Sequence, residues 1–139
     1  MKPMYKCIQC TTEKKLTKSV TGKFCSNRCQ GAWTWLQVTI PRIELGVVKD
    51  SSTLRKYLKF KHGNTCNSCG NNGTWNDKPI TLHVDHIDGN SDNNIPNNLR
   101  LLCPNCHSQT DTFGNKGLGN RYKKLTKRAT YNREYRTGP

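Results

Sequence analysis

The chain is short, polar and strongly basic. Its 139 residues include 23 Lys and Arg against 9 Asp and Glu, for a formal net charge of +14, and only 32% are hydrophobic. A mean hydropathy of −0.86 excludes a large apolar core. We therefore expect one or two small domains that are stabilised by additional cross-links, such as metal sites or disulfides. The charge predicts a polyanionic partner, with nucleic acid favoured over an anionic membrane surface.

The compartment follows from the N-terminus and the cysteines. Residues 1–7 contain no apolar signal-peptide segment, and no apolar run approaches the ~18 residues that span a membrane. The eight cysteines would then lie in a reducing compartment, where metal binding is favoured over a disulfide framework. We therefore expect a cytoplasmic protein, in a bacterial or phage-infected cell.

The first four cysteines follow the pattern C-x₂-C-x₁₄-C-x₃-C, which suits a tetrahedral zinc site. They are Cys7, Cys10, Cys25 and Cys29. Ser26 is placed to cap a helix whose apolar face carries Cys29, Trp33 and Leu36. Redox-active or disulfide-bonded cysteines are the alternative, and whether this segment contacts DNA or only folds stays open.

Residues 38–50 contain a Pro and a Gly without a helical period, and they predict a connector, partly extended. Asp50 then predicts a helix start and Gly63 its stop. The apolar face of this helix is formed by Leu54, Tyr57 and Leu58. Its basic residues either form a solvated face or contact phosphates; they are Arg55, Lys56, Lys59 and Lys61.

Residues 78–87 alternate apolar and polar side chains and predict a half-buried strand. A polar loop rich in Asn and Asp follows, and residues 99–102 are apolar enough for the returning strand. Pro104 predicts the first position of a helix that carries His107 in its first turn. The predicted order is strand, loop, strand, helix.

The second cysteine quartet brackets this hairpin, and it consists of Cys66, Cys69, Cys103 and Cys106. A zinc ion bound there would join the entry of the hairpin to the start of the helix. Four thiolates leave no open position for substrate, so we expect both zinc ions to be structural.

The run from Asp85 to His107 combines Asp85, His86, Asn98 and His107 with a C-x-x-C. In this order and spacing it resembles the HNH endonuclease family, and the resemblance covers residues 54–117. It implies an α+β chain with a small zinc-stabilised ββα-metal domain, here preceded by a small Cys₄ zinc knuckle. Such knuckles precede many phage-type nuclease domains.

The resemblance implies a role for each residue of the run. His86 would be the general base, and Asp85 with His107 would hold one catalytic divalent ion, Mg²⁺ or Mn²⁺, with Ni²⁺, Co²⁺ or Zn²⁺ as alternatives. Asn98 would hold the loop by hydrogen bonds to backbone. Neighbouring strand residues point to opposite faces, so the strand must end or bulge for Asp85 and His86 to reach one phosphate.

Two further residues near the run have open roles. His83 shares the Asp85 face and is either a substrate or supporting contact, or has no role. Arg100 either clamps a phosphate or is a plain exposed strand cation.

The leading interpretation is a metal-dependent endonuclease that hydrolyses DNA phosphodiester bonds. The alternatives are a non-catalytic zinc-finger DNA-binding module and an RNA-cleaving nuclease built on the same residues. We expect a knuckle with its helix at 1–37, a connector at 38–50, the nuclease domain at 51–117 and a basic tail at 118–139. Seven cations of the tail would bind DNA phosphates, unless the tail is merely solvated; they are Arg121, Lys123, Lys124, Lys127, Arg128, Arg133 and Arg136. Monomer and homodimer, nick and double-strand cut, recognition sequence and biological role stay open.

Overall fold

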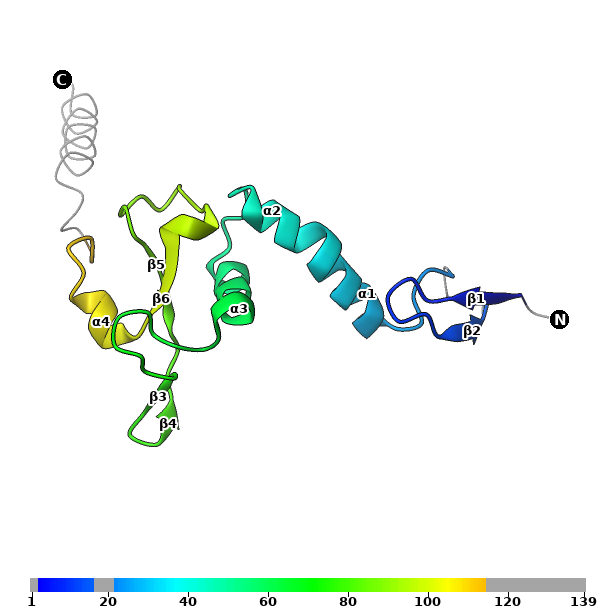
Figure 1. Ribbon diagram of the computed structural model, residues 1–139, viewed down its shortest axis with the longest axis horizontal. Helices are drawn as coiled ribbons and strands as arrows, with labels where there is room; N and C mark the ends of the chain where they lie inside the picture. The colour runs from blue at the N-terminus through cyan, green and yellow to red at the C-terminus, as the bar shows by residue number, and fades with distance from the viewer. Residues whose placement is uncertain (1–2, 17–21, 115–139) are drawn as a thin grey trace, which may run out of the picture. The chain divides into compact units, whose positions relative to one another are not determined.

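The computed structural model describes residues 3–16 and 22–114 (Figure 1). The chain divides into two compact units, Met1–Lys49 and Asp50–Pro139, and each is described by itself. The basic tail at 118–139 lies outside the described residues. Within the described ranges, no helix is both long and apolar enough to cross a membrane.

The first unit begins with a small antiparallel hairpin of β1 (Met4–Lys6) and β2 (Glu13–Lys15). The helix that follows, α1 (Asn27–Thr34), starts where predicted, because the Ser26 hydroxyl accepts the backbone N–H of Cys29 at 3.2 Å. Trp33 on this helix packs against Phe24, with ring centroids 5.7 Å apart. Leu36, which lies just after α1, remains 40% exposed, so the predicted apolar face is only partly covered.

The prediction of a partly extended connector at 38–50 is wrong for its first half. After α1 the chain continues as a π-helical turn η1 (Trp35–Thr39) and then α2 (Ile40–Glu44). The wider turn, in which Ile40 N–H donates to Trp35 O, lets Pro41 follow in the first turn of α2, where its missing N–H is harmless. Gly46, at φ +71°, ends the helix.

The second unit begins with α3 (Ser51–His62), which has the predicted cap and stop. The Asp50 carboxylate accepts from the Ser52 hydroxyl and the Thr53 backbone N–H, and these bonds lower the pKa of Asp50 to about 2. The predicted apolar face is buried: Leu54, Tyr57 and Leu58 are each at most 3% exposed. This face packs on β5 and β6.

The single strand predicted at 78–87 is in fact two. β4 (Lys78–Pro79) pairs with β3 (Thr74–Trp75) in a separate hairpin, and β5 (His83–His86) begins later. Asn76 and Asp77 form the turn with φ of +48° and +58°, as a tight hairpin loop requires. The Asn76-Asp77 pair was the sequence signal for the β3–β4 hairpin. The alternation of apolar and polar residues at 78–87 concealed the break between β4 and β5.

The main sheet pairs β5 antiparallel with β6 (Leu99–Leu102), in a register that sets Asp85 opposite Arg100 and His86 opposite Leu99. A 3₁₀ turn, η2 (Pro96–Asn98), leads into β6, and α4 (Pro104–Ser108) follows it. The buried core of this unit includes Leu82, Leu99, Leu101 and Leu102, all at most 6% exposed. The strand–loop–strand–helix order is therefore confirmed, and the chain is a mixed α+β protein.

Two glycines with nearly equal backbone angles allow a test of the loop after β5. Gly89 has φ +71° and a Cβ there would lie 2.6 Å from Thr112 Cγ2, whereas Gly70, at φ +75°, has open space around it. Gly70→Ala should lower the free energy of unfolding by about 1–2 kcal/mol, which is the cost of holding a residue with a Cβ in the left-handed backbone conformation. Gly89→Ala should lower the free energy of unfolding by clearly more, because the Thr112 side chain must also move away from the new Cβ. Thermal unfolding of the zinc-loaded variants measures both, and equal melting temperatures would contradict the expected crowding at Thr112.

Candidate active site

Three of the sequence-predicted residues line one small pocket of about 110 Å³: Asp85 and His86 from the end of β5, and His107 from α4. Gly89 and Thr112 contribute to the same pocket from the loops. β5 ends at His86, and the chain turns directly afterwards, with Gly89 N–H donating to His86 O at 2.9 Å. The strand end therefore allows two neighbouring side chains to reach one pocket.

Asp85 is a buried carboxylate, 4% exposed, with its two oxygens in different surroundings. Arg100 Nε donates to Oδ2 at 2.7 Å across the two strands, while Oδ1 lies 3.7 Å from His107 Nε2. Arg100 is thus neither a plain exposed cation nor free to act as a phosphate clamp alone. It offsets the burial of the carboxylate and fixes its orientation.

The His107 ring is held on two sides. Its Nδ1 lies 3.1 Å from Nδ1 of His83, and the two rings meet edge to face with centroids 5.1 Å apart. Phe113 makes a similar contact, with centroids 5.2 Å apart. Desolvation lowers the pKa of His83, and the nearby His107 and Arg55 charges lower it further, so His83 favours the neutral form.

His86 is positioned by a residue that the sequence did not single out. Asn94, only 3% exposed, places its amide oxygen 2.9 Å from His86 Nε2. The loop contains several asparagines, and no spacing rule distinguishes Asn94 from its neighbours. Only the fold reveals which asparagine faces the histidine.

Asn98 closes the loop that carries Asn94. Its amide oxygen accepts the backbone N–H of Asp88 at 3.1 Å, and its amide nitrogen donates to Asn93 O at 2.9 Å and to the Asp88 carboxylate at 2.8 Å. Hydrogen bonds from Asn93, Asn90 and Asn98 lower the pKa of Asp88. Asn98 therefore fixes the chain on both sides of the loop, and its partners include the residue next to Asn94.

The Asp85 and His107 donors fit a divalent cation. A carboxylate oxygen and an imidazole nitrogen 3.7 Å apart can both ligate one ion at the usual distance of about 2.1 Å. Two protein ligands of this kind leave positions for water and a phosphate oxygen. The donor set thus suits a catalytic rather than a structural ion.

Each cysteine quartet brings its four sulfur atoms within 4.8 Å of one another, which is close enough to hold one metal ion. The two quartets share the same turn. The Cys7 N–H donates to Thr12 O, and the Cys7 carbonyl oxygen accepts the Thr11 N–H. Cys66 makes the same two bonds, donating to Asn71 O and accepting from Gly70 N–H. The second half of each quartet, Cys25/Cys29 and Cys103/Cys106, differs between the two quartets. Cys103 also caps α4, because its sulfur accepts the Cys106 N–H at 3.5 Å.

The thiols of a metal-free quartet resist joint ionisation. Desolvation raises the pKa of Cys66, but backbone N–H groups of Cys103, Cys69 and Ser68 bring it down to about 6. For Cys106 a hydrogen bond with Ser68 lowers the pKa, yet the neighbouring Cys69 and Cys103 thiols raise it to about 12. Four thiolates at this distance therefore need a cation, which supports metal binding.

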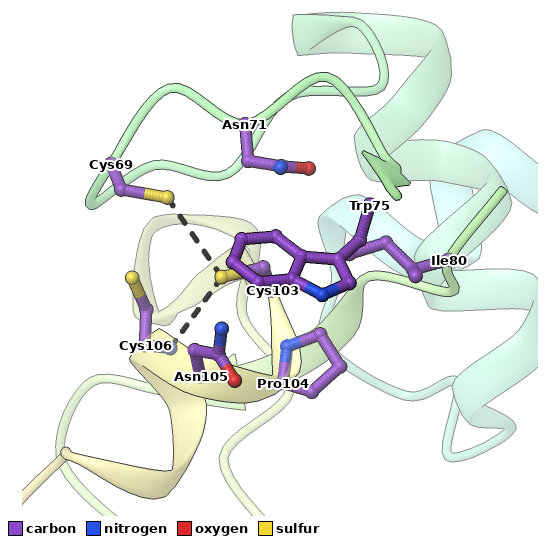
Figure 2. A pocket seen from close by; sticks show the side chains of 8 residues that line it. All are labelled: Cys69, Asn71, Trp75, Ile80, Cys103, Pro104, Asn105 and Cys106. Carbon is purple, nitrogen blue, oxygen red and sulfur yellow. Dashed lines mark hydrogen bonds between the residues drawn. The ribbon is translucent and has the colours of Figure 1, made fainter. Parts of the chain in front are cut away.

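A larger pocket of about 360 Å³ lies against the second quartet (Figure 2). Trp75 and Ile80 form one wall and Pro104 another, and the sulfur-bearing residues Cys69, Cys103 and Cys106 line its far side. The catalytic candidates Asp85, His86 and His107 do not line it. This pocket is distinct from the candidate active site.

The structure has a two-stranded antiparallel hairpin followed by a helix, with Asp85 and His86 at the end of one strand and His107 on the helix. This is the arrangement that the resemblance to the HNH endonucleases predicts. Residues 66–112 match the family model of the HNH endonucleases.

Among curated proteins, the chain is similar to the H-N-H endonuclease F-TflIV of Escherichia phage T5, with 52% identity over 61 residues. The similarity covers 44% of this chain and 26% of that protein, so the chain spans about a quarter of the length of the relative. No solved structure gives a significant match.

Proposed function

We propose that the chain is a metal-dependent endonuclease that hydrolyses DNA phosphodiester bonds at the pocket formed by Asp85, His86 and His107. The convergence of these three side chains on one pocket of about 110 Å³ carries the proposal. The family match and the phage relative support the nuclease class. The net charge of +14 supports a nucleic-acid substrate.

His86 is the proposed general base. An amide oxygen can only accept a hydrogen bond, so the contact with Asn94 Oδ1 keeps the proton of neutral His86 on Nε2. Nδ1 then retains its lone pair and can take a proton from an attacking water. An imidazole is a competent base at neutral pH, because its ordinary pKa is near 6.5.

Asp85 and His107 are the proposed ligands of the divalent ion, and Arg100 holds the Asp85 carboxylate so that Oδ1 faces His107. When bound, such an ion supplies stabilisation of the charge that develops on the phosphate and on the leaving oxygen. Asn98 is proposed as a positioning residue, since it fixes the loop that presents Asn94 to His86.

Both cysteine quartets are proposed to bind structural zinc. The second quartet links the loop before β3 to β6 and α4, through Cys103 N–H donating to Cys66 Sγ at 3.2 Å. In this way the zinc would hold the helix that carries His107.

The proposal is tested by incubating zinc-loaded protein with supercoiled plasmid, and separately with a folded RNA, in Mg²⁺ or Mn²⁺. We expect plasmid nicking or linearisation that requires the added ion and leaves 5′-phosphate ends. Binding of plasmid without cleavage in every ion would instead support a DNA-binding module. Cleavage confined to the RNA would reassign the substrate while retaining the site.

A further inference from the structure

We propose that His83 is a positioning residue that selects the tautomer of His107 and so prepares its Nε2 to bind the divalent ion. The inference rests on the proposed function, because it concerns the ligand His107 of the same site. It assigns a role to a histidine whose role the sequence leaves open.

The argument begins with the distance of 3.1 Å between Nδ1 of His83 and Nδ1 of His107. Two ring nitrogens this close form a hydrogen bond only if one carries a proton and the other offers a lone pair. Two arrangements are therefore available to the neutral pair, and they differ in what His107 presents on its opposite side.

In the first arrangement His107 Nδ1 donates to His83, so His107 Nε2 keeps its lone pair facing Asp85 Oδ1, 3.7 Å away. That lone pair is what a metal ion requires. In the second arrangement His83 donates, and His107 Nε2 instead carries a proton directed at the carboxylate. Only the first arrangement allows Asp85 and His107 to share an ion.

The surroundings favour a fixed geometry for this pair. His83 and His107 are both partly buried, and Phe113 packs on the other side of the His107 ring. The His107 ring is thus confined between Phe113 and His83. A hydrogen-bond acceptor at the His83 position keeps the proton on Nδ1, as second-sphere partners of metal-bound histidines generally do.

The test uses zinc-loaded, full-length protein and two substitutions of similar size. His83→Asn places an amide oxygen close to the position of Nδ1 and retains the acceptor, whereas His83→Leu removes it. Binding of Mn²⁺ is followed by the electron paramagnetic resonance signal of the free ion. We expect His83→Leu to weaken Mn²⁺ binding about 10–100-fold, as loss of an outer-sphere partner typically does, and His83→Asn to stay within about threefold of the wild type.

A spectroscopic measurement accompanies the binding data. Long-range ¹H–¹⁵N spectra with Mg²⁺ bound should show the His107 proton on Nδ1 in the wild type and in His83→Asn. Unchanged Mn²⁺ affinity in folded His83→Leu would overturn the inference. A wild-type His107 that carries its proton on Nε2 would also overturn it, even if His83→Leu does not fold.

Failure of the proposed function gives a different result. Asp85→Ala should abolish the Mn²⁺ site, with the zinc content and circular dichroism unchanged. If wild-type binding of Mn²⁺ survives in Asp85→Ala, then the assignment of the catalytic ion itself is wrong. If Asp85→Ala abolishes binding but His83→Leu does not weaken it, only the role of His83 is wrong.

Discussion

Replacing His86 with alanine is expected to lower the single-turnover rate of DNA cleavage by about 10²–10⁴-fold, the usual contribution of a general base. The fold should survive, because His86 lies at the end of β5 and is not part of the buried core. Rates are measured at saturating enzyme with a radiolabelled or fluorescent duplex, while zinc content and DNA affinity are checked to remain near wild type.

A matched control for this substitution is His62→Ala, which removes an exposed histidine at the end of α3. Its rate should equal that of the wild type. Asn94→Leu should give an intermediate loss, since it removes the acceptor from His86 Nε2 but leaves the base in place. A His86→Ala rate within threefold of the wild type would mean that another group takes the proton.

Replacing Cys66 with serine is expected to unfold the second unit. Structural zinc contributes about 10–16 kcal/mol of apparent binding free energy in small zinc domains, which equals or exceeds the whole stability of an ordinary domain. Cys66 is 2% exposed and its sulfur accepts the Cys103 N–H, so the change removes both a ligand and a buried contact. Circular dichroism and elemental analysis would show lost structure and about one zinc per chain.

Two controls distinguish the kinds of metal site. Cys7→Ser removes a ligand from the other quartet and should leave the amide resonances of β5 and β6 unchanged. Mild treatment with EDTA should stop cleavage reversibly and leave the circular dichroism intact, since only the Asp85/His107 ion is lost. Fewer than two zinc ions per chain after that treatment, with an unchanged spectrum, would contradict structural roles for the quartets.

The parts of the fold that local chemistry determines could be predicted from the sequence. Asp50 and Gly63 delimit α3 because a cap and a stop act within one turn, and Pro104 marks the start of α4 for the same reason. The strand at Leu99–Leu102 follows from its apolar run. Cysteine spacing also grouped the quartets correctly, because each knuckle is closed by short-range hydrogen bonds.

What the sequence could not supply depends on contacts between distant residues or on exceptions to a local rule. Pro41 suggested an interruption, yet a single π-helical turn accommodates it and the helix continues to Glu44. The contact between His83 and His107 spans 24 residues, and it exists only because β5 and α4 pack together. Asn94 likewise becomes distinct from the other loop asparagines only when the loop folds back on His86.

The five residues of α4 connect the second cysteine quartet, a candidate zinc site, to the candidate active site. An isolated helix of this length is not stable in water. Its formation therefore depends on a metal ion that holds Cys103 and Cys106 in the second quartet. His107 directly follows Cys106 in the sequence. By mass action, a ligand that binds only the folded state raises the ratio of folded to unfolded chains, and the ratio rises further as the free ligand concentration increases. Under the proposed assignments, the number of competent nuclease molecules in a cell would therefore track the supply of free zinc, although zinc takes no part in cutting the phosphodiester.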